Sequence, residues 1–222
     1  MNLKNKKIMA YLTLPLFFLI IGYFILGGLM MPYIRPFTSL YDMISQDQTP
    51  DFSQTARNLY NSDAQLPTSG TIQASTLQKL HITDQYGDID IPSVNIRVPL
   101  LYGATNSCLH KGAGTRVQSQ IPGYQRPVMI GAHTIPYFKN LIYVNKGDII
   151  KIKTYYGVFE YKVTGTHIAN ASDTSAYQLK QNKEQLILFT CYPVEGIGEK
   201  EDRFFVYANK ISGPRIIGDI NE

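Results

Sequence analysis

The sequence has no tryptophan, only two cysteines and few charged residues, and each shortage excludes a class of protein. Charged residues make up 17% of the chain and the formal net charge is +4, without the dense basic face typical of nucleic-acid-binding proteins. Two cysteines, Cys108 and Cys191, are fewer than the four or more of a disulfide framework, although they could still pair. Without a CxxC or HExxH motif or a Cys/His cluster with zinc spacing, we expect no metal site and no cofactor.

A long uncharged run near the start predicts a membrane anchor. Residues from Ile8 to Met31 carry no charge, and a membrane-spanning helix needs roughly 20 apolar residues. Lys6 and Lys7 precede the run, so the positive-inside rule places residues 1–7 in the cytoplasm and the later residues outside. A cleaved signal peptide is the alternative, but its apolar region is usually about 7–15 residues long and ends at small residues. No second apolar run follows, so we expect a single membrane pass.

Composition divides the remaining residues into a stalk and a domain. Residues 32–84 are mostly polar, and we expect an extracellular stalk there. Residues 85–222 contain short apolar or alternating runs, such as Ile150–Lys153, that are separated by Gly, Pro and Asn. Six or more short strands with turn residues between them predict an all-β barrel or sandwich. A length of 222 residues suits one such domain together with an anchor.

Three residues that could carry chemistry each adjoin a predicted strand. Cys191 follows an apolar run and lies two residues before Pro193, which must end any central strand pairing. His133 directly follows another apolar strand, and Arg203 opens the strand after Cys191. Taken singly, a lone cysteine is more often a small buried hydrophobe, such a histidine a hydrogen-bonded loop residue, and such an arginine a solvated side chain. The three residue types together favour a cysteine nucleophile with a base and a cation.

The motifs around these residues occur together in one family. Residues Ile187–Cys191 fit the pattern T-L-x-T-C with Ile in place of the first Thr, and Gly131–Thr134 fit a histidine motif that follows a strand. Arg203 lies a dozen residues after Cys191, as the arginine of that family does. Weaker matches are the opening strands from Gly87 to Leu100, the K-G-A-G segment in Leu109–Gly114, and the K-G-D turn at Lys146–Asp148. Over residues 86–211 the chain therefore resembles the sortases, the cysteine transpeptidases of Gram-positive cell envelopes. The resemblance implies an eight-stranded sortase-type β-barrel with short helices, which here follows the transmembrane helix.

The resemblance also implies a mechanism. Cys191 would attack the Thr–Gly bond of an LPxTG-like sorting signal and form a thioacyl enzyme, which an amine of the cell wall then resolves. A free thiol, with a pKa of about 8.5, is little ionised at neutral pH, so His133 would hold the thiolate as an ion pair and later protonate the departing amine. Arg203 would stabilise the oxyanion or hold the substrate backbone. Thr190 and Ala132 are expected to border the substrate, although the side chain of Thr190 could equally be structural.

The class of sortase and two other functions stay open at this point. The residues after Cys191 look most like class D, with class A close behind. Pilus-building class C enzymes usually carry an N-terminal lid, and no DPW- or DPF-like triplet occurs in residues 36–84. We favour an enzyme that anchors surface proteins to the wall, with a pilin-polymerising sortase that uses a pilin Lys amine as the second interpretation. A membrane-tethered β-domain that only binds surface ligands is the alternative of another class. Papain-like and NlpC-type peptidases are disfavoured because they place Cys before His.

Other residues with reactive or charged side chains are set aside. Cys108 lies beside a histidine but has no strand-end context, and His167 is interpreted as a strand-face residue. Arg116 and Arg126 are the alternatives to Arg203, but both precede the histidine strand in a segment expected to be an exposed loop. The stretch around Asp173 has too few acidic oxygens for a calcium site.

Overall fold

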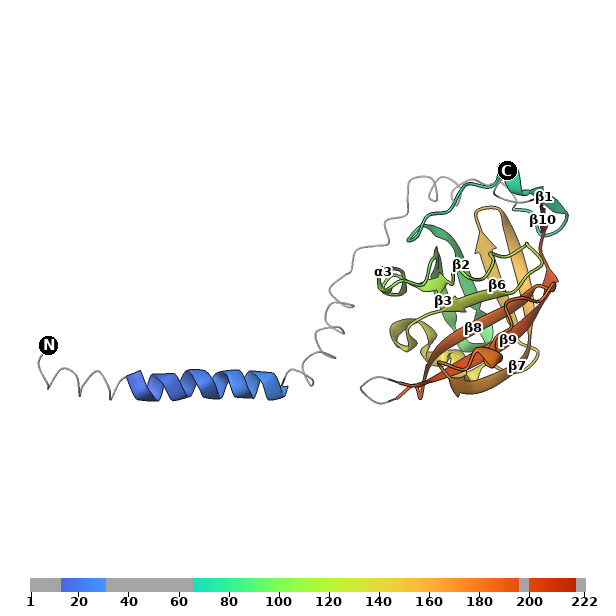
Figure 1. Ribbon diagram of the computed structural model, residues 1–222. Helices are drawn as coiled ribbons and strands as arrows, with labels where there is room; N and C mark the ends of the chain where they lie inside the picture. Colours follow the sequence, from blue (N-terminus) through green and yellow to red (C-terminus); the bar gives the residue numbers. More distant parts are fainter. Residues whose placement is uncertain (1–12, 31–65, 196–199, 219–222) are drawn as a thin grey trace, which may run out of the picture. The chain divides into compact units, whose positions relative to one another are not determined.

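The computed structural model of the chain describes residues 13–30, 66–195 and 200–218. The chain divides into two compact units, residues 1–49 and 50–222. In the first unit, Thr13–Met30 is an α-helix long and apolar enough to cross a membrane (Figure 1). The predicted span 8–31 extends beyond this helix at both ends, and its outer residues lie outside the described part of the chain.

The second unit consists mostly of short strands. The strands are β1 (Thr71–Gln73), β2 (Gln85–Ile91), β3 (Ile96–Tyr102), β4 (Ala113–Thr115), β5 (Val128–Gly131), β6 (Ile149–Thr154), β7 (Gly157–Asn170), β8 (Gln185–Tyr192), β9 (Asp202–Ser212) and β10 (Arg215–Ile217). Short helical turns connect them: η1 (Ala74–Thr76), η2 (Pro92–Val94), α3 (Asn106–Leu109), η3 (Thr134–Phe138), η4 (Lys139–Tyr143) and η5 (Thr174–Ala176). β8 ends at Tyr192, directly before Pro193, as the missing N–H of proline requires.

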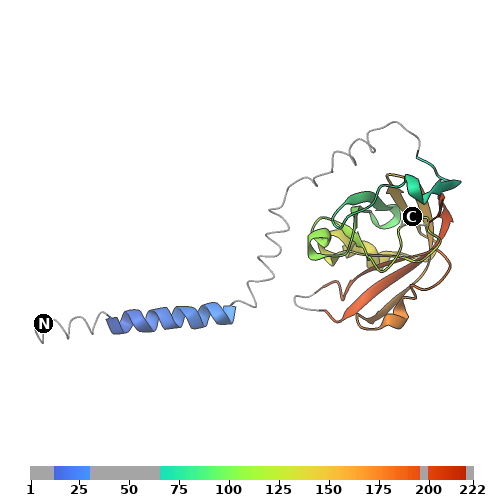
Figure 2. The ribbon, with the colours of Figure 1, turned by 45° about the horizontal axis from the view of Figure 1, so that its top comes forward.

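Eight of the strands close into a barrel in the order β2-β3-β4-β5-β8-β9-β7-β6. The β3–β4 and β5–β8 pairs are parallel, and the remaining neighbours are antiparallel. β8, β9 and β7 are consecutive neighbours in this barrel; Figure 1 labels them, and Figure 2 shows the barrel from a second direction. This closed barrel confirms the predicted all-β, eight-stranded fold, and closure leaves none of these strands with an unpaired edge.

A second sheet, which the sequence did not predict, joins the two ends of the unit. β1 pairs in parallel with β10, and the adjacent Ala74 is only 2% exposed in the barrel core. The hydroxyl of Tyr155 donates a hydrogen bond of 3.1 Å to the carbonyl of Gln78. These N-terminal residues belong to the segment 32–84 that was interpreted as a stalk, so the last part of that segment packs on the barrel. Residues 31–65 lie outside the described part of the chain.

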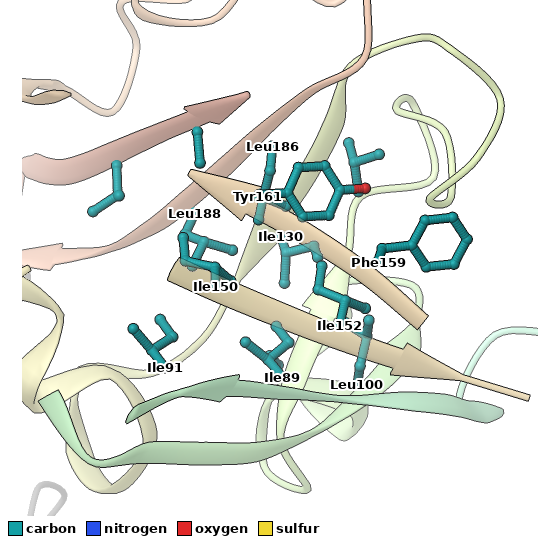
Figure 3. Close-up of a cluster of buried hydrophobic side chains, with 14 of the residues drawn as sticks. Ile89, Ile91, Leu100, Ile130, Ile150, Ile152, Phe159, Tyr161, Leu186 and Leu188 are labelled. Carbon is teal, nitrogen blue, oxygen red and sulfur yellow. The ribbon is translucent and has the colours of Figure 1, made fainter. Parts of the chain in front are cut away.

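Alternation along the strands fills the barrel interior with aliphatic and aromatic side chains. In β6, Ile150 and Ile152 are fully buried, whereas Lys151 and Lys153 face solvent, as their period of two predicts. Figure 3 shows part of this interior cluster, to which six of the strands contribute labelled residues (Ile89, Ile91, Leu100, Ile130, Ile150, Ile152, Phe159, Tyr161, Leu186 and Leu188). Each fully buried side chain of this size contributes about 1.5–3 kcal/mol of transfer free energy, so this interior stabilises the barrel that carries the site.

The outer face of the β5–β8–β9 sheet carries a second, smaller apolar cluster. Its buried members are Met129, Ala169, Ala176, Ile187 and Phe205. Side chains from η5 and the residues after it, including Tyr177 and Leu179, pack against these residues. The sheet is therefore covered on both faces along most of its length, and the candidate site lies at the end where β5 and β8 finish.

Candidate active site

Strand register places the three predicted site residues on one face of the sheet. In the antiparallel β8–β9 ladder, Cys191 is directly opposite Arg203. Residues paired in this way project to the same side, with Cβ atoms about 4.5–5.5 Å apart. In the parallel β5–β8 pair, Gly131 is opposite Phe189, so two residues further along each chain segment His133 is level with Cys191. The three side chains therefore come together from three separate segments.

The residues between them point into the barrel and join the segments. The side chain of Thr190 is buried, and its hydroxyl donates to the carbonyl of Ala132 at 3.0 Å. The hydroxyl of Thr134 lies 3.0 Å from that of Thr190 and 3.2 Å from the carbonyl of Cys191. Two hydroxyl protons serve these three contacts, so two of them form hydrogen bonds at any time. These hydrogen bonds connect β8 to the segment after β5. They therefore fix the position of His133 relative to Cys191 along the strand direction.

A single pocket of about 500 Å³ is shared by the three residues. His133, Cys191 and Arg203 all line it. Its apolar wall includes Ile82 and Val117, whose side chains are 53% and 47% exposed. A partly open hollow with apolar walls and a few convergent polar groups is typical of a site for a peptide or other ligand.

Arg203 is held at the pocket by the backbone around it. Its Nη1 donates to the carbonyls of Lys200 at 2.7 Å and Asp202 at 2.9 Å. The ammonium group of Lys200 in turn donates to the carbonyls of Pro193, Val194 and Glu195, just after β8. Within residues 66–195 and 200–218, the hydrogen bonds that Arg203 donates both come from Nη1, and Nε and Nη2 donate none.

The environment of His133 favours its neutral form. The ring is half-buried, and this burial lowers the pKa of His133 below its ordinary value. The His110 ring, whose centroid lies 5.6 Å from that of His133, lowers the pKa further. The lowered pKa favours the unprotonated imidazole, which can accept a proton.

The two cysteines have different environments. Cys108 and Cys191 are both free thiols, but Cys108 is fully buried and Cys191 is partly exposed in the pocket. The Sγ of Cys108 lies 3.1 Å from the hydroxyl of Thr105 and donates to the carbonyl of Tyr102 at 3.6 Å. Only Cys191 is thus open to a substrate. Among the described residues, no group of three or more His, Cys, Asp or Glu side chains is arranged to hold a metal ion.

Comparison with known proteins assigns this arrangement to a family. Residues 89–211, which contain all three site residues, match the family model of the sortase domain. The chain belongs to the sortase family. It is similar to Sortase D of Bacillus subtilis (strain 168), with 31% identity over 126 residues, or 57% of this chain and 64% of that protein. It is also similar to Sortase A of Streptococcus agalactiae serotype III (strain NEM316), with 30% identity over 163 residues, or 67% of this chain and 61% of that protein. The sortase chain thus aligns with less than two thirds of either relative's length.

Solved sortase structures share its fold. A Clostridium perfringens Sortase D5 transpeptidase matches with a TM-score of 0.54 and 24% identity, over 61% of this chain and 84% of that one. The pilus-related Sortase C of Group B Streptococcus matches with a TM-score of 0.53 and 25% identity, over 60% of this chain and 70% of that one. These likenesses support the sortase-type barrel.

The sortase pocket contains each residue that the sequence singled out. Besides His133, Cys191 and Arg203, both Ala132 and Thr190 border it, although the Thr190 hydroxyl is occupied inside the barrel. The roles of all five residues remain predictions.

Three further residues at or beside the site were not assigned a role in it from the sequence. His110 lies next to His133, and the hydroxyl of Thr134 lies 3.2 Å from the carbonyl of Cys191. Arg116 was interpreted as an exposed loop residue, but it lines the same pocket as Cys191. Its position directly after the three-residue strand β4 was the available signal, and so short a strand has no detectable alternation.

Proposed function

We propose that this sortase is a membrane-anchored cysteine transpeptidase that cleaves an LPxTG-like sorting signal between Thr and Gly. The observation that carries the proposal is the single pocket that Cys191, His133 and Arg203 line together. A thiol, a neutral imidazole and a guanidinium in one hollow are the groups that acyl transfer through a thioester requires.

In the first half-reaction, His133 accepts the thiol proton of Cys191 as the sulfur attacks the carbonyl carbon of the substrate Thr. The lowered pKa of His133 leaves its imidazole able to accept this proton. Arg203 donates from Nε or Nη2 to the oxyanion that develops on the carbonyl oxygen. When the tetrahedral intermediate collapses, the Thr–Gly bond breaks and the departing amine takes its proton from His133.

In the second half-reaction, an amine attacks the thioacyl carbon. His133 removes the proton from the attacking nitrogen and returns it to the Cys191 sulfur as the C–S bond breaks. A new amide bond forms and the free thiol is restored. We propose an amine of the cell wall as acceptor and an LPxTG-bearing surface protein as donor. The helix Thr13–Met30 would hold the enzyme in the membrane with its barrel outside the cell.

The test uses the purified full-length chain in detergent, an LPxTG peptide with a fluorophore on its amino-terminal side, and a soluble amine. We expect a ligated product that depends on both the peptide and the amine. The Cys191→Ala variant should form none, whereas Cys108→Ala, which changes the buried thiol, should still form it. Product formation that persists in Cys191→Ala would overturn the assignment. If no condition yields product while the peptide binds, the non-catalytic binding domain is favoured instead.

A pilin-polymerising role is the second candidate, because a pilus-related Sortase C is among the similar structures. The same assay separates the two roles. A wall-anchoring enzyme should prefer an amine with the structure of a cell-wall cross-bridge, whereas a pilin polymerase should prefer the Lys side chain of a pilin domain.

A further inference from the structure

The pocket that contains Cys191 extends well beyond the reacting sulfur. Arg116 also lines it, and Arg116 and Arg203 are the only charged residues that line it within the described chain, with no Asp or Glu among its walls. The hollow therefore carries positive charge at two separate places. The proposed chemistry uses Arg203 and leaves Arg116 without a role.

Strand register gives the offset between Arg116 and Cys191 along the strand direction. The backbone N–H of Arg116 donates to the carbonyl of Met129 at 2.8 Å, and Met129 is opposite Ile187 in the β5–β8 pair. Cys191 lies four residues beyond Ile187 on β8, which corresponds to about 13 Å along the strand direction. An extended peptide covers that distance in about four residues.

The side chain of Arg116 is held in place but is not neutralised. Its guanidinium lies over the ring of Tyr177, 5.5 Å from the ring centroid. Tyr177 packs against the outer apolar cluster, so the stacking surface is itself supported. No ion pair within the described residues includes Arg116. A guanidinium in a cation–π contact keeps its charge and its N–H donors, so it can still bind a carboxylate.

The order of steps in transpeptidation indicates which half of the substrate lies near the Arg116 guanidinium. The acyl half stays attached to the sulfur through both half-reactions, whereas the other half must leave and give way to an amine. The part of the pocket that Arg116 lines therefore suits the acyl half, which lies on the amino-terminal side of the scissile bond.

We propose that Arg116 selects sorting signals that carry a carboxylate about four residues before the scissile bond, at or next to the position that precedes the Pro of the motif. This inference rests on the proposed transpeptidase function. It names the substrate class as sorting signals with an acidic amino-terminal flank.

The experiment is a charge scan with the full-length chain. A set of LPxTG peptides carries a single Asp, Asn or Lys at each position from the variable x back to the second residue before Leu, omitting the Pro. Steady-state kcat/KM is measured for the wild type, Arg116→Glu and Arg116→Lys. Arg126→Glu is the matched control, because Arg126 is an exposed arginine of the same segment that does not line the pocket.

For the wild type, we expect Asp to raise kcat/KM over Asn by about two- to fivefold at one position near Leu, as for a partly exposed ion pair. Lys should lower it there, and high salt should reduce both effects. Arg116→Glu should reverse the order of Asp and Lys at that position, whereas Arg116→Lys and Arg126→Glu should keep it.

Two failures are distinguishable. If the wild type processes the peptides with kcat/KM independent of charge at every position, the role of Arg116 is overturned and the transpeptidase proposal stands. The role of Arg116 is overturned in the same way if Arg126→Glu changes the preference as much as Arg116→Glu does. If the wild type processes none of the peptides, the proposed function fails and this inference fails with it.

Discussion

Cys191 and Arg203 are direct cross-strand partners in the β8–β9 ladder, so a sulfur and a guanidinium project side by side from a rigid sheet. At the same end of the barrel, Lys200 binds the carbonyls after β8 and Arg203 binds the carbonyl of Lys200. The relative position of the two side chains therefore depends on backbone pairing and not on a flexible loop.

Replacing Arg203 should affect the reaction more than the fold. Arg203→Ala removes the donor for the oxyanion, and we expect kcat/KM to fall by about 100- to 1,000-fold. Arg203→Lys keeps the charge but cannot bind the carbonyls of Lys200 and Asp202 and also reach the substrate, so most of the loss should remain. Arg97→Lys, on the exposed face of β3, is the control and should leave the rate near that of the wild type. Full activity in Arg203→Lys would show that charge alone is sufficient.

The pH dependence of the reaction should respond to His110. His133 must be unprotonated to accept the thiol proton, so kcat/KM falls as pH drops through the pKa of His133. Burial and His110 both lower that pKa, which places the acid limb below the ordinary imidazole range. His110→Gln removes the second cause and should move the acid limb to higher pH, while burial keeps it below the ordinary value.

The His110→Gln substitution leaves the other charged and titratable residues of the pocket, Arg116, Cys191 and Arg203, unchanged. A shift of the acid limb can therefore be assigned to the loss of His110. The control is His167→Gln, which removes an exposed histidine on β7. An acid limb that stays in place in His110→Gln, or that moves equally in His167→Gln, would contradict the influence of His110 on His133.

Gly131 should be required for the packing beneath the pocket. A Cβ atom at this position would collide with the ring of Phe189, which lies opposite it on β8. We expect Gly131→Ala to lower the free energy of unfolding by about 1–3 kcal/mol, measured by urea denaturation. Gly165→Ala is the matched strand control, because nothing lies within 4 Å of a Cβ at Gly165. Equal stability losses for the two variants would contradict the close packing at Gly131.

Thr190 offers a test of structure against substrate binding. Thr190→Val keeps the shape of the side chain but leaves the carbonyl of Ala132 without its donor in the barrel interior. We expect a loss of about 1–3 kcal/mol in the free energy of unfolding. KM for the peptide should change little, because the hydroxyl of Thr190 faces Ala132 and Thr134 and not the pocket. A large rise in KM at unchanged stability would instead assign the hydroxyl to the substrate.

The strands were predictable from the sequence where local alternation is strong. Ile150–Lys153 shows a clear period of two, and the structure confirms the strand. The closure of the barrel was predicted from the family resemblance, since the parallel pairing of β5 with β8 joins segments about 60 residues apart and leaves no local pattern. β1 and β10 have three residues each, and β1 lies in a polar segment, so neither could be recognised.

Only the site residues that lie within recognisable sequence motifs could be predicted. His133, Cys191 and Arg203 lie at strand ends within recognisable motifs, and the structure brings them to one pocket. Arg116 lines the same pocket and His110 lies beside His133, and both positions result from packing between segments, which single-sequence patterns do not encode. The lowered pKa of His133 has the same origin, because it depends on burial and on a neighbouring ring.

The most direct measurement is the mass of the enzyme during turnover without an amine acceptor. The full-length chain is mixed with an LPxTG peptide, quenched in acid and digested, and the acylated peptide is sequenced by mass spectrometry. We predict a thioacyl adduct, ending at the Thr of the signal, on Cys191 in the wild type and in Cys108→Ala, and none in Cys191→Ala. An adduct on Cys108 or on any other residue, or turnover of the peptide by Cys191→Ala, would contradict the account.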